Sequence, residues 1–231
     1  MLHAGNLKVL GAAMDHGVGM AGPGLQVRFR PARPDDAATA VPLIYSSGPA
    51  AFDYVFAAGK GGDAPSFLQY CFVDGAGEFG WRNHWVGVAD ERVVAVGAGY
   101  GADTKGKFML AAARQILSHY GLRHGAAVIT RGLRVESVIR PPEGDMHYLA
   151  HLAVVPELRG CGVGRALIDR LVDSAREAGR GRVALDVAAS NPRAKALYRR
   201  AGFKVVSERR SRLANAQVRV PDHRRMERAI D

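Results

Sequence analysis

The stretch that decides the fold is "LAVVPELRGCGVGRALIDRLVDSARE", which runs from Leu152 to Glu177. Its apolar run ends at Pro156, a loop of alternating glycines follows, and a segment with helical spacing comes next. The expected order is therefore strand, glycine loop and helix. The first backbone N–H groups of a helix have no partner within it, and the helix dipole is positive at that end. The stretch thus predicts an anion site, above all for phosphate.

The residues of the loop suit a bound phosphate. Gly160, Gly162 and Gly164 have no side chains, so an anion can come close to the backbone. Arg159 adds a positive charge and paired hydrogen-bond donors. An ordinary tight turn rich in glycine would show the same alternation, so the loop alone leaves both interpretations open.

Two common phosphate motifs do not fit this loop. A dinucleotide-binding fingerprint needs a third glycine three residues after the second, where this chain has Arg165 or Leu167. A P-loop needs lysine and then serine or threonine after its last glycine, but Arg165 and Ala166 follow Gly164. A phosphate ligand of another kind is therefore expected.

The run "VVPELRGCGVGRAL" resembles the acyl-CoA-binding motif of the GNAT superfamily of N-acetyltransferases, Arg/Gln-x-x-Gly-x-Gly/Ala, through Arg159, Gly162 and Gly164. Further along, "NPRAKALYRRAGF" resembles the family's second signature, Asn-x-x-Ala-x-x-x-Tyr-x-x-x-Gly-Phe. The matching residues of this second motif are Asn191, Ala194, Tyr198, Gly202 and Phe203. Both motifs stand in the family's order, and the resemblance covers roughly residues 148–203. It implies that the glycine loop holds the pyrophosphate of coenzyme A.

The resemblance implies acetyl-CoA as the cosubstrate and no metal. In the family, the strand before the loop splays from its neighbour, and its backbone bonds the pantetheine arm. The residues expected to bind the cofactor are Leu152, Ala153, Val154, Arg159, Gly160, Cys161, Gly162, Val163, Gly164, Arg165, Asn191, Ala194 and Tyr198. Cys161 belongs to this set by its place in the loop, since nothing near it marks a nucleophile. Asn191 can also be read as a helix cap only.

Three residues are candidates for the chemistry: Tyr198, Tyr148 and His151. The resemblance implies that Tyr198 protonates the leaving thiolate, although a tyrosine at helical spacing also fits simple packing. Several family members carry a base where this chain has Tyr148, and a tyrosine, with a pKa near ~10, is a poor base at neutral pH. Strict alternation puts both His147 and His151 on the face opposite Tyr148, although a bulge could reverse part of that. Water alone is the remaining alternative for the base.

The resemblance implies an N-acetyltransferase that moves the acetyl group of acetyl-CoA to a primary amine, of a small molecule or a peptide, by direct attack. One rival is another acyl group, such as succinyl or propionyl. The other rival is a non-catalytic acyl-CoA-binding or regulatory module with a basic partner-binding surface. Protein N-termini, lysines, amino acids, polyamines and antibiotics all remain as acceptors, with a weak bias against polycations because the chain itself is positive.

Composition and charge limit the partners. The chain has 231 residues, 48% of them hydrophobic, which suffices for a sizeable core. Its net charge of +10 attracts anions, but no nucleic-acid recognition module is visible, so nucleic acid is not the expected partner. The two cysteines and eight histidines show neither a disulfide framework nor a zinc spacing, which suits a reducing, cytoplasmic location. No run reaches the length of a membrane span, no membrane partner is expected, and a homodimer stays open.

The pattern along the chain predicts an N-terminal arm over residues 1–24 and a single domain over residues 25–231. The expected fold class is α/β (α+β), with a mixed, mainly antiparallel central sheet flanked by helices. Residues 103–144 exceed a simple turn and predict a helical insertion whose first helix ends at Gly121. The insertion either walls the acceptor site or only packs on the domain. Glu136, Glu143 and Asp145 near its end either meet a cationic amine or are simply solvated.

Overall fold

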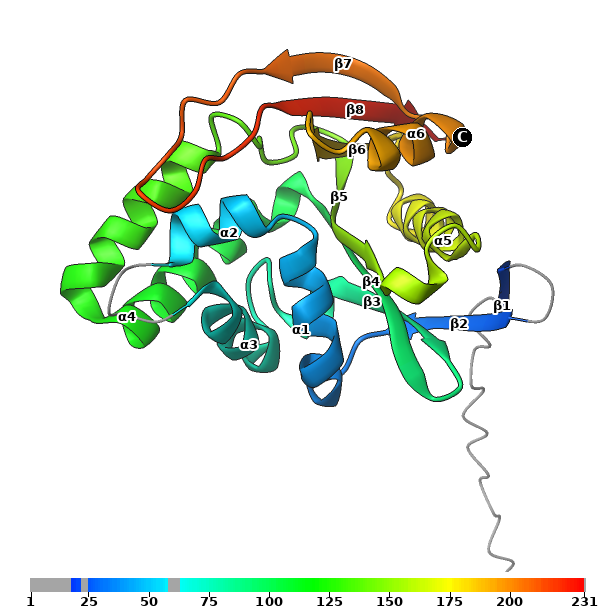
Figure 1. Cartoon of the computed structure of the whole chain (residues 1–231), viewed down its shortest axis with the longest axis horizontal. Coiled ribbons are helices and arrows are strands. Elements are labelled where there is room, and N and C mark those ends of the chain that lie inside the picture. The colour runs from blue at the N-terminus through cyan, green and yellow to red at the C-terminus, as the bar shows by residue number, and fades with distance from the viewer. Residues whose placement is uncertain (1–17, 22–24, 58–62, 231) are drawn as a thin grey trace, which may run out of the picture.

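The computed structural model describes residues 18–21, 25–57 and 63–230. Within them, eight strands form one sheet in the order β1-β2-β3-β4-β5-β6-β8-β7 (Figure 1). Every neighbouring pair is antiparallel except β5 and β6, which run parallel. The strands are β1 (Val18–Ala21), β2 (Leu25–Pro31), β3 (His84–Ala89), β4 (Arg92–Gly101), β5 (Met146–Val154), β6 (Arg182–Ala188), β7 (Lys204–Arg209) and β8 (His223–Ala229). The predicted mixed, mainly antiparallel sheet is confirmed.

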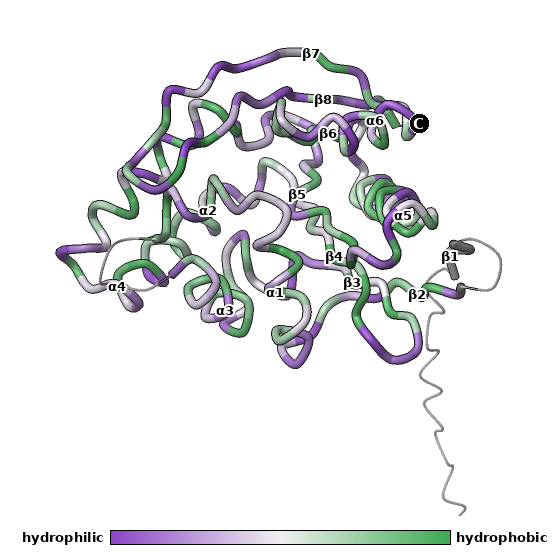
Figure 2. Tube along the Cα trace, viewed as in Figure 1, coloured by the Kyte–Doolittle hydropathy of each residue, from purple (hydrophilic) through white to green (hydrophobic). Residues whose placement is uncertain are grey.

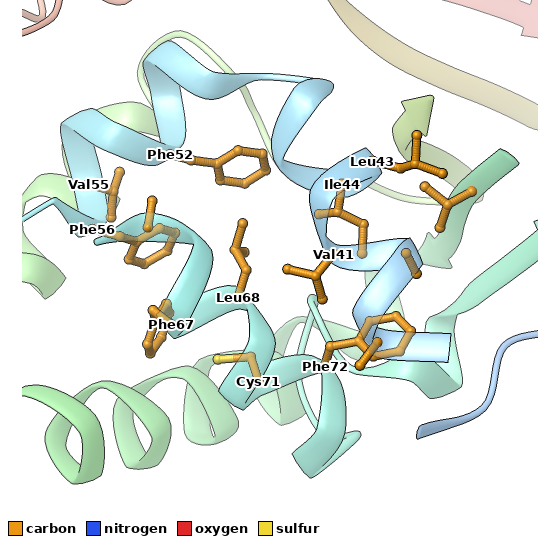
Figure 3. Close-up of a cluster of buried hydrophobic side chains, with 14 of the residues drawn as sticks. Val41, Leu43, Ile44, Phe52, Val55, Phe56, Phe67, Leu68, Cys71 and Phe72 are labelled. Atoms are coloured by element: carbon orange, nitrogen blue, oxygen red, sulfur yellow. The ribbon is translucent and has the colours of Figure 1, made fainter. Parts of the chain in front are cut away.

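Helices cover both faces of the sheet. One hydrophobic cluster joins one face to α1 (Ala37–Ser46), α2 (Pro49–Phe56), α3 (Ala64–Asp74) and α4 (Lys105–Val135), and Figure 3 shows part of it. A second cluster joins the other face to α5 (Val163–Glu177) and α6 (Pro192–Arg200). Short 3-10 turns connect these elements: η1 (Pro34–Asp36), η3 (Trp81–Asn83), η4 (Ala102–Thr104) and η5 (Pro156–Leu158).

Aromatic side chains supply much of the first cluster. Phe67 and Phe72 of α3 are fully buried, and Phe52 and Phe56 of α2 are nearly so. The rings of Phe56 and Phe67 lie 4.5 Å apart between centroids (Figure 3). Burial of each such side chain contributes about 1.5–3 kcal/mol, so the spacing of aromatic residues is what fixes α2 and α3 against each other.

Helix α4 is bent at Gly121. This residue has φ 71° and ψ 171°, a conformation outside the helix that is essentially open to glycine alone. The two halves of α4 therefore meet at an angle. They pack closely, because a Cβ atom on the buried Gly125 would lie 3.1 Å from Cδ2 of Leu117. The predicted end of the first helix at Gly121 is confirmed.

Strand β5 separates from β6 after a short parallel pairing. The two strands pair only from Met146–Tyr148 against Arg182–Ala184, and the rest of β5 has no partner on that side. On its other side β5 stays paired with β4, with a bulge between Val96 and Ala98. The bulge falls at His151, which has a positive φ of 56°. The sheet is thus split beside the glycine loop.

Strand β8 is unusually polar for a strand inside a sheet, as its purple colour in Figure 2 indicates. Its Arg225 is buried and lies opposite Asp186 of β6, with Nη1 3.5 Å from Oδ2. The Asp186 side chain is only 1% exposed. Removal of Asp186 would leave the charge of the buried Arg225 without a carboxylate, so the pair holds β6 against β8.

Part of the predicted N-terminal arm, Val18–Ala21, forms β1 and pairs with β2. Residues 1–17 and 22–24 lie outside the described residues, and the predicted boundary between arm and domain stays a prediction. Among the helices of the described ranges, none combines the length and apolar character that crossing a membrane requires.

Candidate active site

The glycine loop joins β5 to α5. Gly160 and Gly162 have positive φ angles of 91° and 90°, in the left-handed region that favours glycine. Gly162 immediately precedes the first turn of α5, so the N–H groups of Val163 and Gly164 have no acceptor within the helix. Gly160, Gly162 and Gly164 line a cavity of about 1300 Å³. Free donors at the positive end of α5 suit the anion that the sequence predicts.

Two arginines stand beside this loop. Arg159 lines the cavity, and its Nε donates to the carbonyl of Val154 at 3.0 Å, which ties it to the end of β5. Arg193 of α6 also lines the cavity, with Nη2 only 3.7 Å from where a Cβ atom on Gly160 would be. Sequence reasoning missed Arg193, which occupies an unspecified position of the second motif. The two guanidinium groups suit a bound phosphate.

The other loop residues have mainly structural contacts. Arg165 lines the cavity, but its guanidinium is bonded to the carboxylate of Asp169 and to the carbonyl of Arg200. Val163, the first residue of α5, has a fully buried side chain. The thiol of Cys161 is free, and the residue is exposed. Neither residue lines the cavity, and the N–H of Cys161 already donates to the carbonyl of Leu158, so of the two only the N–H of Val163 is free for an anion.

The second motif places its residues on α6. The side-chain oxygen of Asn191 accepts a hydrogen bond from the N–H of Ala194 at 3.0 Å, so Asn191 caps the helix, and both residues also line the cavity. Tyr198 lines the cavity from the same helix and is 9% exposed. Burial raises its pKa to about 12. No described residue is a hydrogen-bond partner of its hydroxyl, which is therefore protonated and free to donate.

Leu152, Ala153 and Val154 lie on the separated part of β5 and line the cavity. Ala153 and Val154 pair with β4, at Val96 and Ala95. Because alternate backbone groups of a strand point to opposite sides, the N–H and C=O groups on the β6 side have no strand partner here. This open edge is where the sequence predicts the pantetheine arm.

Tyr148 lies at the base of the split between β5 and β6. Its hydroxyl donates to Oδ2 of Asp186 at 3.0 Å, and the guanidinium carbon of Arg225 lies 5.0 Å from its ring centre. Burial, and next the charge of Asp186, raise the pKa of Tyr148 well above its ordinary value. A hydroxyl that is already donating and resists ionisation is a poor base, so the geometry disfavours that role for Tyr148.

The side chain of His151 lies on the other face of β5 from the one that strict alternation predicts for it. The alternative that the sequence left open is the one found: a bulge at its positive φ turns the side chain toward α2, away from the face that strict alternation predicts. There its ring lies 6.0 Å from that of Phe52 and 5.2 Å from that of Phe79, between centroids. His147, by contrast, lies beside Arg180 and Gly99 on the α5 face, as alternation predicts.

A chain of hydrogen bonds fixes the tautomer of His151. Nδ1 of His84 lies 2.9 Å from the carbonyl oxygen of Gly80, which can only accept, so Nδ1 carries the proton. Burial, and next the neighbouring His151, lower the pKa of His84 to about 3, so its ring is neutral and Nε2 is an acceptor. Nδ1 of His151, 3.1 Å away, must then be the donor. In neutral His151 the lone pair is therefore on Nε2.

Glu78 faces that lone pair. Its Oε1 lies 3.5 Å from Nε2 of His151 and accepts a hydrogen bond from the hydroxyl of Tyr100 at 2.8 Å. Burial, and next the charge of Glu78, raise the pKa of Tyr100 well above its ordinary value, so the hydroxyl remains a donor. Sequence reasoning missed Glu78, His84 and Tyr100. Pairing of β3, β4 and β5 brings the last two to His151, and the turn before β3 adds Glu78.

The sequence model for the acetyltransferase (GNAT) family matches residues 62–203, more than half of the chain. The chain belongs to the GNAT acetyltransferase family. An N-acetyltransferase structure from Staphylococcus aureus Mu50 superposes with a TM-score of 0.62 at 18% identity, over 87% of this chain and 99% of that one. A Salmonella typhimurium acetyltransferase solved with its cofactor acetyl-CoA superposes with a TM-score of 0.51 at 16% identity, over 89% and 94%. At these identities the likeness shows the GNAT fold alone.

A curated relative of this GNAT chain is the mycothiol acetyltransferase of Beutenbergia cavernae, which is 41% identical over 69 residues. That match covers 30% of this chain and 23% of the relative, so the chain spans less than a quarter of the relative's length. GNAT proteins use acetyl-CoA, and the free donors of the glycine loop fit its phosphates. Among the described residues, no group of three or more His, Cys, Asp or Glu side chains could hold a metal ion.

Proposed function

We propose that this chain transfers an acetyl group from acetyl-CoA to a primary amine. One observation carries the proposal: a single cavity reaches from the glycine loop, past the open edge of β5, to Glu78 and His151. A phosphate-bearing acyl donor and a basic group that serves an amine can thereby meet in the same space.

In this proposal the pyrophosphate of acetyl-CoA binds at the N-terminus of α5, beside Arg159 and Arg193. The pantetheine arm follows Leu152, Ala153 and Val154, whose side toward β6 has no strand partner. A backbone N–H of that open edge stabilises the negative oxygen of the tetrahedral intermediate, as hydrogen-bond donors do in acyl transfer.

His151 is the base and Tyr198 the acid of the proposed reaction. The amine nitrogen bonds to the acyl carbon, and Nε2 of His151 takes the proton that the nitrogen loses. The carboxylate of Glu78, 3.5 Å away, stabilises the imidazolium that forms. The C–S bond then breaks, and the hydroxyl of Tyr198 gives its proton to the departing thiolate of coenzyme A.

Acyl groups other than acetyl and a non-catalytic acyl-CoA-binding module remain the alternatives to this function. The pairing of a tautomer-fixed histidine with a carboxylate supports turnover over binding alone, since a binding module needs no base. A cytoplasmic location, a possible homodimer and the lack of a membrane partner are proposed with it on the sequence alone.

Release of free thiol and the mass of the product test the function. With acetyl-CoA and a panel of primary amines, we expect thiol release matched by an amine that has gained one acetyl group. His151→Gln should abolish most of this turnover and keep the rise in melting temperature that acetyl-CoA causes. His124→Gln, at an exposed position of α4, is the matched control and should behave as wild type. Binding of acetyl-CoA without thiol release for any amine would replace the proposal by a binding module.

A further inference from the structure

We propose that the acceptor is an amine with a single positive charge and an apolar body, bound between α2 and α4 with its ammonium group at Glu78 and His151. This inference rests on the proposed function and adds the chemical class of its second substrate. Three features of the cavity carry it: a gap between two acceptors, the apolar wall around that gap, and the sign of the charges at the rim.

The gap lies between Oε1 of Glu78 and Nε2 of His151, which are 3.5 Å apart. In neutral His151 the tautomer leaves Nε2 without a proton, and the carboxylate has none. The two acceptors then need a proton between them, which either protonation of His151 or a donor of a bound group supplies. A primary ammonium has three N–H donors and a positive charge, so it fits both acceptors.

The wall around this gap is apolar. The rings of Phe52 and Phe79 lie against His151, and α4 adds side chains from both of its halves. Met109 of the first half and Leu133 of the second line the cavity although they are 59% and 60% exposed. Large apolar side chains left this open at a cavity mouth suit contact with an apolar ligand.

The charges near the rim disfavour a second cation, because positive side chains outnumber negative ones there. Among the charged side chains that α4 and the segment after it contribute to the cavity lining, Lys105 and Arg140 are positive and only Glu136 is negative. The carboxylate of Asp186 also reaches the lining, but it is 1% exposed and already contacts Tyr148 and Arg225. A second ammonium on the acceptor would therefore meet a rim with more positive than negative side chains, where Glu136 is the carboxylate that could pair with it.

Matched pairs of amines test this class with the full chain and saturating acetyl-CoA. Hexylamine and 1,6-diaminohexane have the same carbon chain and differ by one terminal ammonium. 2-Phenylethylamine and phenylalanine differ by one carboxylate. We expect kcat/KM to favour the first member of each pair by about 10²-fold. A second ammonium meets a rim that is positive on balance, and a carboxylate next to the reacting nitrogen is repelled by Glu78.

Two neighbouring residues of α4 provide a sharper test. Met109 lines the cavity, whereas Leu110, which is 77% exposed, does not. Met109→Asp should shift the preference toward 1,6-diaminohexane by at least tenfold, because it gives the second ammonium a partner. Leu110→Asp adds the same charge outside the cavity and should leave the preference as it is. Both sites are exposed, so folding should survive.

The outcomes separate this inference from the function. Acetylated products with equal or better kcat/KM for the charged member of each pair would overturn the apolar class and leave acetyl transfer intact. An unchanged preference in Met109→Asp would place the acceptor elsewhere. Acetylation of none of the amines, with acetyl-CoA still bound, would instead count against the function itself.

Discussion

Nδ1 of His151 lies 3.1 Å from Nε2 of His84, and the far side of His84 is fixed by the carbonyl of Gly80. The carbonyl of Gly80, the ring of His84 and the ring of His151 form a hydrogen-bonded chain. In this chain the proton of each neutral ring is on Nδ1. The result is a lone pair on Nε2 of His151, facing the cavity and Glu78. In the proposed reaction, His84 would therefore act through His151, as a positioning residue.

His84→Phe should lower kcat by about 10²-fold, at the lower end of what a positioned base contributes. The phenyl ring keeps the volume and removes the acceptor for the Nδ1 proton of His151. His84→Gln should recover much of the rate, because its amide can donate to Gly80 and accept from His151. Steady-state kinetics with KM for acetyl-CoA as the internal control checks this. Equal activity in both variants would mean that the tautomer of His151 does not matter.

Tyr198→Phe should bind acetyl-CoA nearly as wild type and turn over about 10²–10⁴-fold more slowly, since the hydroxyl would act only as charge grows on sulfur. The ring is kept, so its packing near Phe203 should survive. Pre-steady-state kinetics that isolates the chemical step is the measurement. Undiminished chemistry would make Tyr198 a packing residue, and lost binding would make it a cofactor contact.

Gly162→Asp should remove the rise in melting temperature that acetyl-CoA causes, by adding bulk and negative charge where a phosphate binds. Gly179→Asp is the matched control, because Gly179 also has a positive φ of 67° and follows the other end of α5. Both variants carry a similar backbone strain, of about 1–2 kcal/mol. Only the control should keep the stabilisation by acetyl-CoA. Equal losses in the two would assign the effect to strain.

Gly121→Val should weaken turnover through the acceptor and leave acetyl-CoA binding unchanged. A branched residue does not adopt φ 71° and ψ 171°, so the two halves of α4 must reorient, and with them the wall that carries Met109 and Leu133. Gly106→Val, in the first turn of α4 with nothing within 4 Å of an added Cβ atom, is the control. The expected result is a higher KM for the amine in Gly121→Val alone.

The stability of the fold should fall in acid partly because of His147. This side chain is buried, neither ring nitrogen has a hydrogen-bond partner among the described residues, and burial, with a smaller effect of Arg180, lowers its pKa to about 4. The unfolded chain then takes up a proton near pH ~6.5 while the folded chain does not. The free energy of unfolding should therefore decrease from about pH 6.5 down to about pH 4 and not below, as far as this group is concerned.

His147→Leu isolates that contribution. Urea unfolding at pH 7 and pH 4.5 should show that wild type loses about 2–3 kcal/mol more than the variant between the two pH values. At pH 7 the variant should be no less stable, because leucine has a similar volume and no polar atoms to satisfy. The same loss in both proteins would assign the acid sensitivity to other groups, such as His84 or His223, whose pKa values burial also lowers.

The sequence by itself determined the parts of this protein that are local in the chain. The strand, glycine loop and helix of Leu152–Glu177 follow from consecutive residues, because positive φ, free N–H groups and helical spacing are properties of neighbours. The same holds for the cap at Asn191 and the bend at Gly121. From these features the sequence predicted the family and the residues of the cofactor-binding half of the site.

Only the tertiary structure decided which residues form the part of the site that is proposed for the acceptor amine. Glu78 lies in the turn shortly before His84 of β3, but His151 comes from β5, 67 residues after His84, and only the pairing of β3, β4 and β5 brings it to them. The side of the sheet on which His151 lies depended on a bulge of one residue, because a shift by one position exchanges the two faces of a strand. The loop proposed for phosphate follows from neighbouring residues, whereas the groups proposed to face the amine meet only through long-range strand pairing.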